Sequence, residues 1–217
     1  EGQLVAVGGE PLAEVAQQRQ HRLEAGERSG QRVGVGMVER IEDAGESVVV
    51  VDNLSTGFSA FLPEVVPLFI GDAGDENLVE GVIAQHGIDS IIHFAGSVVV
   101  PDSMRDPLGY YRNNTMTTRS LLNAAVRGGV SRFIFSSTAA VYGNPDQVPV
   151  PEIAPTRPLS PYGSSKLMTE IMLHDVASAH GMSYVVLRYF NVAGADPKDR
   201  KSTRLNPVTY TDLVCRL

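Results

Sequence analysis

Short apolar runs alternate with longer stretches of helical periodicity from residue 46 onward. The runs are rich in valine and isoleucine, and the stretch from Val48 to Val51 contains no polar residue, as expected of a strand covered on both faces. Five runs predict strands: "SVVVVDN", "VPLFIGD", "DSIIHFAG", "RFIFSS" and "SYVVLRYFN".

Helices are predicted between these strands, at roughly residues 76–86, 107–127 and 161–180. In the last of them Leu167, Ile171, Met172 and Val176 form a stripe at a spacing of about 3.6 residues. Residues 145–161 carry six prolines and form an ordered excursion between a strand and a helix. The order of elements predicts right-handed crossovers and an α/β fold, a Rossmann-like doubly wound parallel sheet with flanking helices.

Composition narrows the choice of partners. The 217 residues, 43% of them hydrophobic, suffice for one domain, and the formal net charge of -7 argues against nucleic acid or an anionic membrane as the partner. The single cysteine, Cys215, cannot form an internal disulfide, so the cytoplasm is the expected compartment. No apolar run approaches the roughly 18 residues of a membrane span, and the N-terminus has no signal-peptide pattern. We therefore expect a soluble protein that binds small molecules or protein, and we predict no metal site.

Polar, small or aromatic residues follow the predicted strands, where ligands of such sheets bind. Asp52 ends the first of these strands, and its carboxylate can accept both ribose hydroxyls of an adenosine while repelling a 2′-phosphate. NAD is therefore favoured over NADP, although an Asx turn with Asn53 explains the same residues. Asp72 can face an adenine amino group or simply close a turn, and Phe94 to Ser97 ("FAGS") permit either close cofactor approach or a tight turn. His93 is interpreted as a core residue.

Thr138, Tyr162 and Lys166 carry the strongest chemical signal. Tyr-x-x-x-Lys on a helix puts Tyr162 and Lys166 on one face, and Thr138 ends the preceding strand. A phenol with a pKa of about 10 is a poor base, but a nearby ammonium and a cationic nicotinamide both favour phenolate. Tyr162 can then remove a proton from a sugar hydroxyl. A partly buried tyrosine near an exposed lysine is the alternative interpretation.

The chain resembles the UDP-glucose 4-epimerases of the extended short-chain dehydrogenase/reductase superfamily over about residues 44–198. The matching motifs are "VVVVDNLSTG", "HFAGSVVVPDS", "YYRNNT", "RFIFSSTAAVYG", "SPYGSSKLMTE" and "LRYFNVAGADP". The resemblance implies interconversion of UDP-glucose and UDP-galactose with bound NAD, and a homodimer formed through the two long helices.

The resemblance also implies a role for each matching residue. Tyr162 is the general base, Lys166 holds the cofactor ribose and lowers the pKa of the phenol, and Thr138 contacts the sugar hydroxyl. Asn191 reaches the UDP-sugar. The other residues implied to contact the cofactor are Asp52, Asn53, Asp72, Ala73, Phe94, Ala95, Gly96, Asn113, Ser136 and Tyr189.

Both ends of the chain depart from the family pattern. The family's glycine-rich loop, Gly-x-x-Gly-x-x-Gly, is not found, because only Gly34 fits by spacing and Gln31 and Arg28 occupy the other two positions. We therefore divide the chain into a divergent segment (1–43), an NAD-binding core (44–200) and an unrelated short tail (201–217). Both flanks are typical of a truncated or frameshifted reading frame around an epimerase core, with the substrate region cut short.

Two alternative functions remain open. A sugar-nucleotide 4,6-dehydratase of the same superfamily needs an acid-base pair after the strand-end threonine, where this chain has Ala139 and Ala140. The second alternative is an inactive or truncated nucleotide-binding fragment, which the divergent ends favour.

Overall fold

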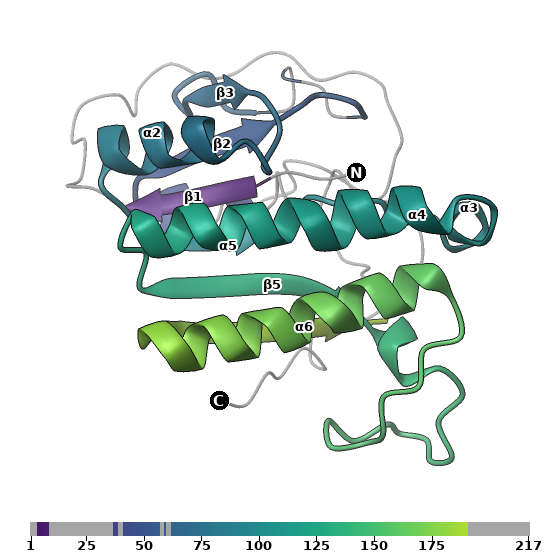
Figure 1. The fold of residues 1–217 in the computed structure, drawn as a ribbon. Helices are drawn as coiled ribbons and strands as arrows, with labels where there is room; N and C mark the ends of the chain where they lie inside the picture. Colours follow the sequence, from purple (N-terminus) through teal and green to yellow (C-terminus); the bar gives the residue numbers. More distant parts are fainter. Residues whose placement is uncertain (1–3, 9–36, 39–40, 57–58, 60–61, 191–217) are drawn as a thin grey trace.

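The computed structural model describes residues 4–8, 37–38, 41–56, 59 and 62–190. Within these residues six strands form one sheet in the order β3-β2-β1-β4-β5-β6, the order of a doubly wound fold (Figure 1). The strands are β1 (Leu4–Gly8), β2 (Val48–Asp52), β3 (Leu68–Ile70), β4 (Ile88–His93), β5 (Arg132–Thr138) and β6 (Ser183–Tyr189).

The sheet is parallel apart from β1. Strands β2 and β3 are paired in parallel, as are β4 and β5, and β5 and β6. Strand β1 runs antiparallel to both neighbours, with Leu4 opposite Val51 and His93 and Gly8 beside Ile88. The expected parallel sheet is therefore confirmed with this one exception, which lies in the segment predicted to diverge. Antiparallel pairing satisfies the backbone groups of a central strand as well as parallel pairing does, so the apolar run "LVAV" suits the position in either direction.

The helices follow the predicted ranges closely. They are α2 (Glu76–His86), α3 (Val100–Arg105), α4 (Pro107–Tyr110), α5 (Thr117–Arg127) and α6 (Pro161–His180), with a π-helix η2 (Tyr111–Met116) and a 3-10 helix η3 (Ala139–Tyr142). The predicted helix 107–127 is thus interrupted by the π-helix, and α3 was not predicted. The proline-rich stretch contains no helix or strand between residues 143 and 160, as expected.

Capping residues set the ends of α2 and α6. The Asp75 side chain accepts hydrogen bonds from the N–H groups of Asn77 and Leu78, and α2 ends at Gly87 in the left-handed conformation. Ser160 caps α6 by accepting from the Gly163 N–H, and Gly181 ends that helix in the same left-handed conformation. Because Pro161 then occupies the first turn of α6, Tyr162 is held at the very start of the helix.

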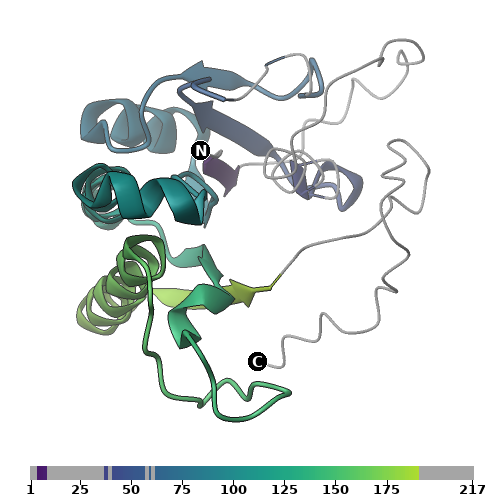
Figure 2. The same ribbon diagram turned by 90° about the vertical axis from the view of Figure 1, so that its right-hand side faces the viewer.

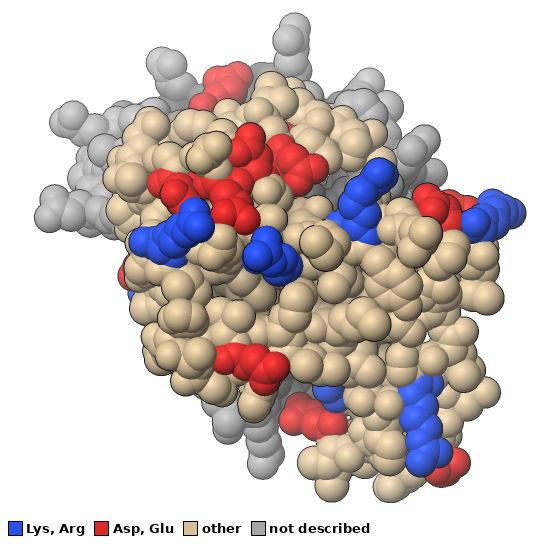
Figure 3. Space-filling model, in the orientation of Figure 1, with Lys and Arg blue, Asp and Glu red and all other residues tan. Residues whose placement is uncertain are grey.

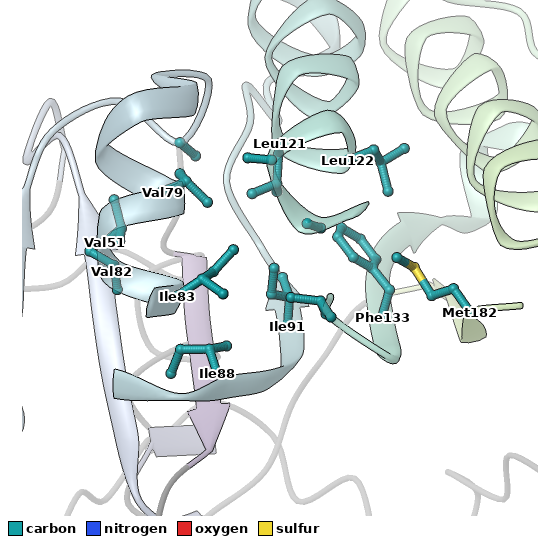
Figure 4. Close-up of a cluster of buried hydrophobic side chains, with 14 of the residues drawn as sticks. Val51, Val79, Val82, Ile83, Ile88, Ile91, Leu121, Leu122, Phe133 and Met182 are labelled. Carbon is teal, nitrogen blue, oxygen red and sulfur yellow. The ribbon is translucent and has the colours of Figure 1, made fainter. Parts of the chain in front are cut away.

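Helices α2, α5 and α6 cover one face of the sheet (Figure 2). Figure 4 shows the core between them, where Val79 and Ile83 of α2 and Leu121 and Leu122 of α5 meet Ile91 of β4. Alternate side chains of β2 face opposite ways, so Val49 and Val51 join this core while Val48 and Val50 join a second cluster with Val38, Leu62, Val66 and Ile92. Both faces of β2 are therefore covered, as its continuous apolar run predicts.

The buried face of α6 differs from its predicted apolar stripe. Met172 and Val176 pack against the core, but Ile171 is 55% exposed. The buried positions include Tyr162, Lys166, Thr169 and Glu170. The apolar stripe therefore predicted only part of the buried face, because α6 also buries polar side chains against the sheet.

Ion pairs join α2 to α5 at the surface. Arg127 pairs with Glu76 and Glu80, and Figure 3 shows acidic and basic side chains side by side over these helices. Such exposed pairs contribute little stability, about 0–1 kcal/mol each. Among the described residues, no helix combines the length and apolarity that crossing a bilayer requires.

Candidate active site

A pocket of about 170 Å³ lies at the carboxyl ends of β2, β3 and β4, the edge where such sheets bind ligands. It brings together the predicted cofactor residues Asp52, Asn53, Asp72, Ala73, Ala95, Gly96 and Asn113. The further lining residues are Val51, Ser55, Gly71, Ser97 and Thr117.

Local turns hold the acidic side chains of this pocket. The Asp52 Oδ1 atom accepts from the Leu54 N–H at 2.8 Å, and the Asp72 Oδ1 atom accepts from the Gly74 N–H at 2.6 Å. Asn53 likewise accepts from the Ser55 N–H at 3.0 Å. Each of these residues closes a turn and also lines the pocket, and their binding of an adenosine stays a prediction.

Gly96 forms the wall between the pocket and α6. Its φ of 146° favours glycine, and a Cβ there would lie 2.7 Å from Asn114 Oδ1 and 3.5 Å from Lys166 Nζ. The absent side chain thus leaves the pocket open and lets the lysine approach its wall.

Gly96→Ala is expected to lower the free energy of unfolding by about 1–3 kcal/mol, because the methyl group is both strained and too close to Asn114. The matched control is Gly81→Ala in α2, where a Cβ meets nothing within 4 Å and helix propensity predicts a gain of about 0.4–1 kcal/mol. Urea unfolding of both variants tests this. Equal effects in the two variants would show that Gly96 carries no special constraint.

Thr138, Tyr162 and Lys166 meet at the carboxyl end of β5. The Thr138 hydroxyl lies near the Tyr162 phenol and favours its ionised form. The Lys166 Nζ atom donates to the carbonyl oxygen of Ser136 at 3.1 Å and lies 4.9 Å from the centre of the Phe135 ring. Lys166 is only 3% exposed, so the alternative of an exposed lysine beside the tyrosine is wrong for this chain.

Burial dominates the protonation of these groups. It lowers the pKa of Lys166 to about 8, which still leaves the ammonium protonated at neutral pH. It raises the pKa of the Tyr162 phenol, and the nearby Thr138 hydroxyl acts in the opposite direction. In the chain alone Tyr162 is therefore a neutral phenol, and its conversion to a base requires further positive charge beside it.

His93 is a core residue, as predicted. It is fully buried, and its Nε2 atom lies 2.8 Å from the Thr118 Oγ1 atom. Burial, and then the charge of Lys166, lower the pKa of its imidazole to about 3. Because the His93 imidazole stays neutral at neutral pH, we do not expect it to act as a second proton-transfer group in the site.

Asn114 was missed by sequence reasoning, although it organises the pocket wall. It accepts from the Ser97 N–H at 2.7 Å and donates to the Ser97 carbonyl at 3.0 Å and to Ser165 Oγ at 2.9 Å. Its neighbour Asn113 lines the pocket and donates to Ser97 Oγ at 3.2 Å. Both asparagines lie in the π-helix η2, and such turns are frequent at functional sites. The asparagine pair inside a predicted helix was the available signal, since asparagine is a weak helix former.

The other predicted residues lie around this centre. Ser136 contributes its carbonyl to Lys166, and Tyr189 lies opposite Thr138 in the pairing of β5 with β6. Phe94 packs against the second core cluster and is not among the pocket's lining residues. Asn191 lies outside the described residues.

The sequence pattern of the NAD dependent epimerase/dehydratase family matches residues 30–212. A UDP-glucose 4-epimerase of Azospirillum brasilense is 52% identical over 168 residues, which make up 77% of this chain and 48% of that protein. The structure of UDP-glucose 4-epimerase from Brucella ovis in complex with NAD is 38% identical, has a TM-score of 0.75 and covers 82% of this chain and 55% of its own. The structure of UDP-glucose 4-epimerase from Bifidobacterium longum in complex with NAD+ and UDP is 36% identical and has a TM-score of 0.72. The match covers 76% of this chain and 52% of that one.

These similarities extend over most of the chain but only part of its relatives. The chain spans about half the length of the curated relatives that it matches. The match to residues 30–212 contains every site residue discussed above, with the pocket and the Tyr162–Lys166 pair in the same segment. The chain therefore belongs to the NAD dependent epimerase/dehydratase family.

Proposed function

We propose that this chain supplies the nucleotide-binding half and the catalytic residues of a UDP-glucose 4-epimerase, which interconverts UDP-glucose and UDP-galactose. The observation that carries the proposal is the meeting of Thr138, Tyr162 and Lys166 beside Gly96, at the wall of a pocket that contains Asp52 and Asp72. The proposal draws its substrate from the relatives, among them the Bifidobacterium longum enzyme, whose structure contains NAD+ and UDP.

The pocket suits the adenosine half of NAD. Asp52 and Asn53 would bind the ribose hydroxyls, Asp72 and Ala73 the adenine, and Ala95 and Gly96 would allow close approach of the backbone. Lys166 reaches the wall at Gly96 and would hold the second ribose, with Asn113, Ser136 and Tyr189 nearer the nicotinamide. Bound NAD would supply a hydride acceptor that later returns the same hydride.

Tyr162 would remove the proton from the hydroxyl on carbon 4 of the hexose. Thr138 would orient that hydroxyl by hydrogen bonding, Lys166 would contribute positive charge, and a cationic nicotinamide would supply the further charge that favours phenolate. After the keto sugar turns over, protonated Tyr162 would return the proton to its oxygen. Asn191 would contact the UDP-sugar.

Asp52 predicts a preference for NAD over NADP of at least about tenfold, because a 2′-phosphate would lie beside a buried carboxylate. Asp52→Asn should narrow the preference, whereas the exposed control Asp146→Asn should leave it unchanged. Calorimetric titration of both dinucleotides gives the ratio. Equal affinities in the unchanged chain would remove Asp52 from the ribose site.

The two rival functions predict different products. A 4,6-dehydratase must transfer protons after Thr138, where the described structure has the methyl groups of Ala139 and Ala140 at the start of η3. A non-catalytic nucleotide-binding domain would give no product. We therefore propose to assay UDP-galactose with a chimera in which residues 44–190 replace the matching part of the Azospirillum brasilense relative. UDP-glucose as product supports epimerisation, a 4-keto-6-deoxy product supports dehydration, and no turnover supports the binding domain.

A homodimer formed through the two helices at 107–127 and 161–180 also belongs to this proposal. Leu108, Met116, Met168 and Ile171 are exposed apolar residues on those helices and support it. The composition still favours a cytoplasmic location.

A further inference from the structure

A partly buried ion pair joins Arg188 of β6 to Glu170 of α6. Arg188 Nε is 3.1 Å from both carboxylate oxygens of Glu170, and Arg188 Nη2 is 2.6 Å from Oε2. The Ser137 hydroxyl also donates to Glu170 Oε1. Glu170 is 6% exposed, so its charge is neutralised by these contacts rather than by water.

The arginine extends the network to the proline-rich segment. Arg188 Nη1 donates to Tyr142 Oη at 2.9 Å and to the carbonyl of Glu152 at 3.2 Å, and its guanidinium lies over the Tyr142 ring. We call Ser137, Tyr142, Glu170 and Arg188 the Glu170 cluster. It connects α6, β5, β6 and η3 with residues 143–160, which the catalytic proposal does not use.

Two members of the cluster lie beside residues of the proposed site. Glu170 follows Lys166 by four residues on the buried face of α6, and Ser137 lies between Ser136 and Thr138. The side chain of Ser137 faces α6 because it continues the alternation of Phe133 and Phe135, which join the core on that side. The bond from Ser137 to Glu170 therefore ties the end of β5 to the helix that carries Tyr162.

From this geometry we infer that Ser137, Glu170 and Arg188 are positioning residues, which hold the Thr138 hydroxyl against Tyr162 and fasten residues 143–160 to the same helix. The inference rests on the proposed function only in treating Tyr162 as the base. Thr138 Oγ1 accepts from the Ala140 N–H at 3.1 Å, which leaves its own proton to donate to the phenol. A small displacement of β5 from α6 would separate the two hydroxyl groups while both residues stay buried.

Ser137→Ala tests the link with no change of charge. Moving the Thr138 hydroxyl away from the phenol would raise the pKa of Tyr162, since its proximity opposes the effect of burial. The chain would be labelled with fluorinated tyrosine, whose phenol ionises at lower pH, and followed by fluorine NMR, with Tyr162→Phe assigning the signal. We expect Ser137→Ala to raise the pKa of Tyr162 in the otherwise unchanged chain and to have no further effect in Thr138→Val. An unchanged pKa, or the same shift in both backgrounds, would overturn the inference.

Glu170→Gln provides a second test, in which the direction of the pKa shift of Tyr162 separates two causes. Removing a negative charge would by itself lower the pKa of a nearby phenol, whereas loss of positioning would raise it. We expect a rise, and a fall would overturn the role of Glu170. Ser178→Ala on the exposed face of α6 is the matched control, with no expected shift.

Hydrogen exchange tests the role of Arg188. Arg188→Leu should speed exchange in residues 143–160 by about tenfold or more and leave α2 and β4 unchanged. Uniform acceleration, or none, would overturn the fastening role. Neither the NMR nor the exchange measurement needs turnover, so failure of the epimerase proposal in the UDP-galactose assay would be distinguishable from failure of this inference.

Discussion

Tyr162→Phe is expected to lower turnover of UDP-galactose by about 100-fold to 10,000-fold in the chimera that contains residues 44–190, because a general base typically contributes that much. The substitution removes one oxygen and leaves the ring, which packs edge-to-face against Tyr110 with centroids 6.4 Å apart. NAD binding should therefore be retained. The loss should appear in kcat and kcat/KM alike, since the missing proton transfer belongs to the transition state.

Tyr184→Phe is the control for this experiment. Tyr184 lies at the start of β6, is 38% exposed and contacts the His174 ring, far along the strand from Thr138 and Tyr189. The Tyr184→Phe chimera should turn over UDP-galactose as fast as the parent chimera. A Tyr162→Phe enzyme within a few-fold of the parent would mean that another group removes the proton.

The second large effect concerns NAD affinity. The chain should bind NAD weakly, because β1 ends at Gly8 beside Ile88, at the edge of the sheet opposite to Asp52 and Gly96. In this fold a glycine-rich turn normally follows the first strand at the carboxyl edge and presents backbone N–H groups and a helix N-terminus to the pyrophosphate. Two or three charge-assisted hydrogen bonds at about 1.5–3 kcal/mol each correspond to an affinity difference of about 100-fold to more than 10,000-fold.

Replacing residues 1–36 with a strand followed by Gly-Gly-Ala-Gly-Tyr-Ile-Gly-Ser-His should restore that affinity. The matched control has the same strand with alanine at each glycine of the loop, which keeps the strand and blocks close approach of the backbone. Calorimetric NAD titration compares the three proteins. Tight binding by the unmodified chain would show that its own N-terminal segment supplies a phosphate site.

The strands and helices of the core could be predicted because each is specified locally. The apolar run of β2 reflects burial on both faces, and the ends of α2 and α6 coincide with Asp75, Gly87, Ser160 and Gly181, which cap them. Residues at the carboxyl ends of parallel strands must share one edge, so strand order alone placed Asp52, Asp72, Ala95 and Gly96 together.

The remaining features depend on contacts between distant segments. The direction of β1 cannot be predicted from five mostly apolar residues, because the backbone pairs equally well either way. The Asn114 and Glu170 networks join residues up to 51 positions apart, and no local pattern marks such pairs. The buried polar face of α6 could not be predicted for the same reason, since the partners of Lys166 and Glu170 lie on β5 and β6.

The fate of the hydrogen on carbon 4 distinguishes hydride transfer from any route that exchanges this hydrogen with water. If residues 44–190 carry out epimerisation at that carbon, the hydrogen leaves and returns as hydride without mixing with water, while the hydroxyl proton passes through Tyr162. UDP-galactose deuterated at carbon 4 would be converted by the chimera in ordinary water and the product examined by NMR and mass spectrometry. We expect UDP-glucose that keeps its deuterium at carbon 4. Product that has exchanged this deuterium for solvent hydrogen would contradict hydride transfer, and with it the proposed function.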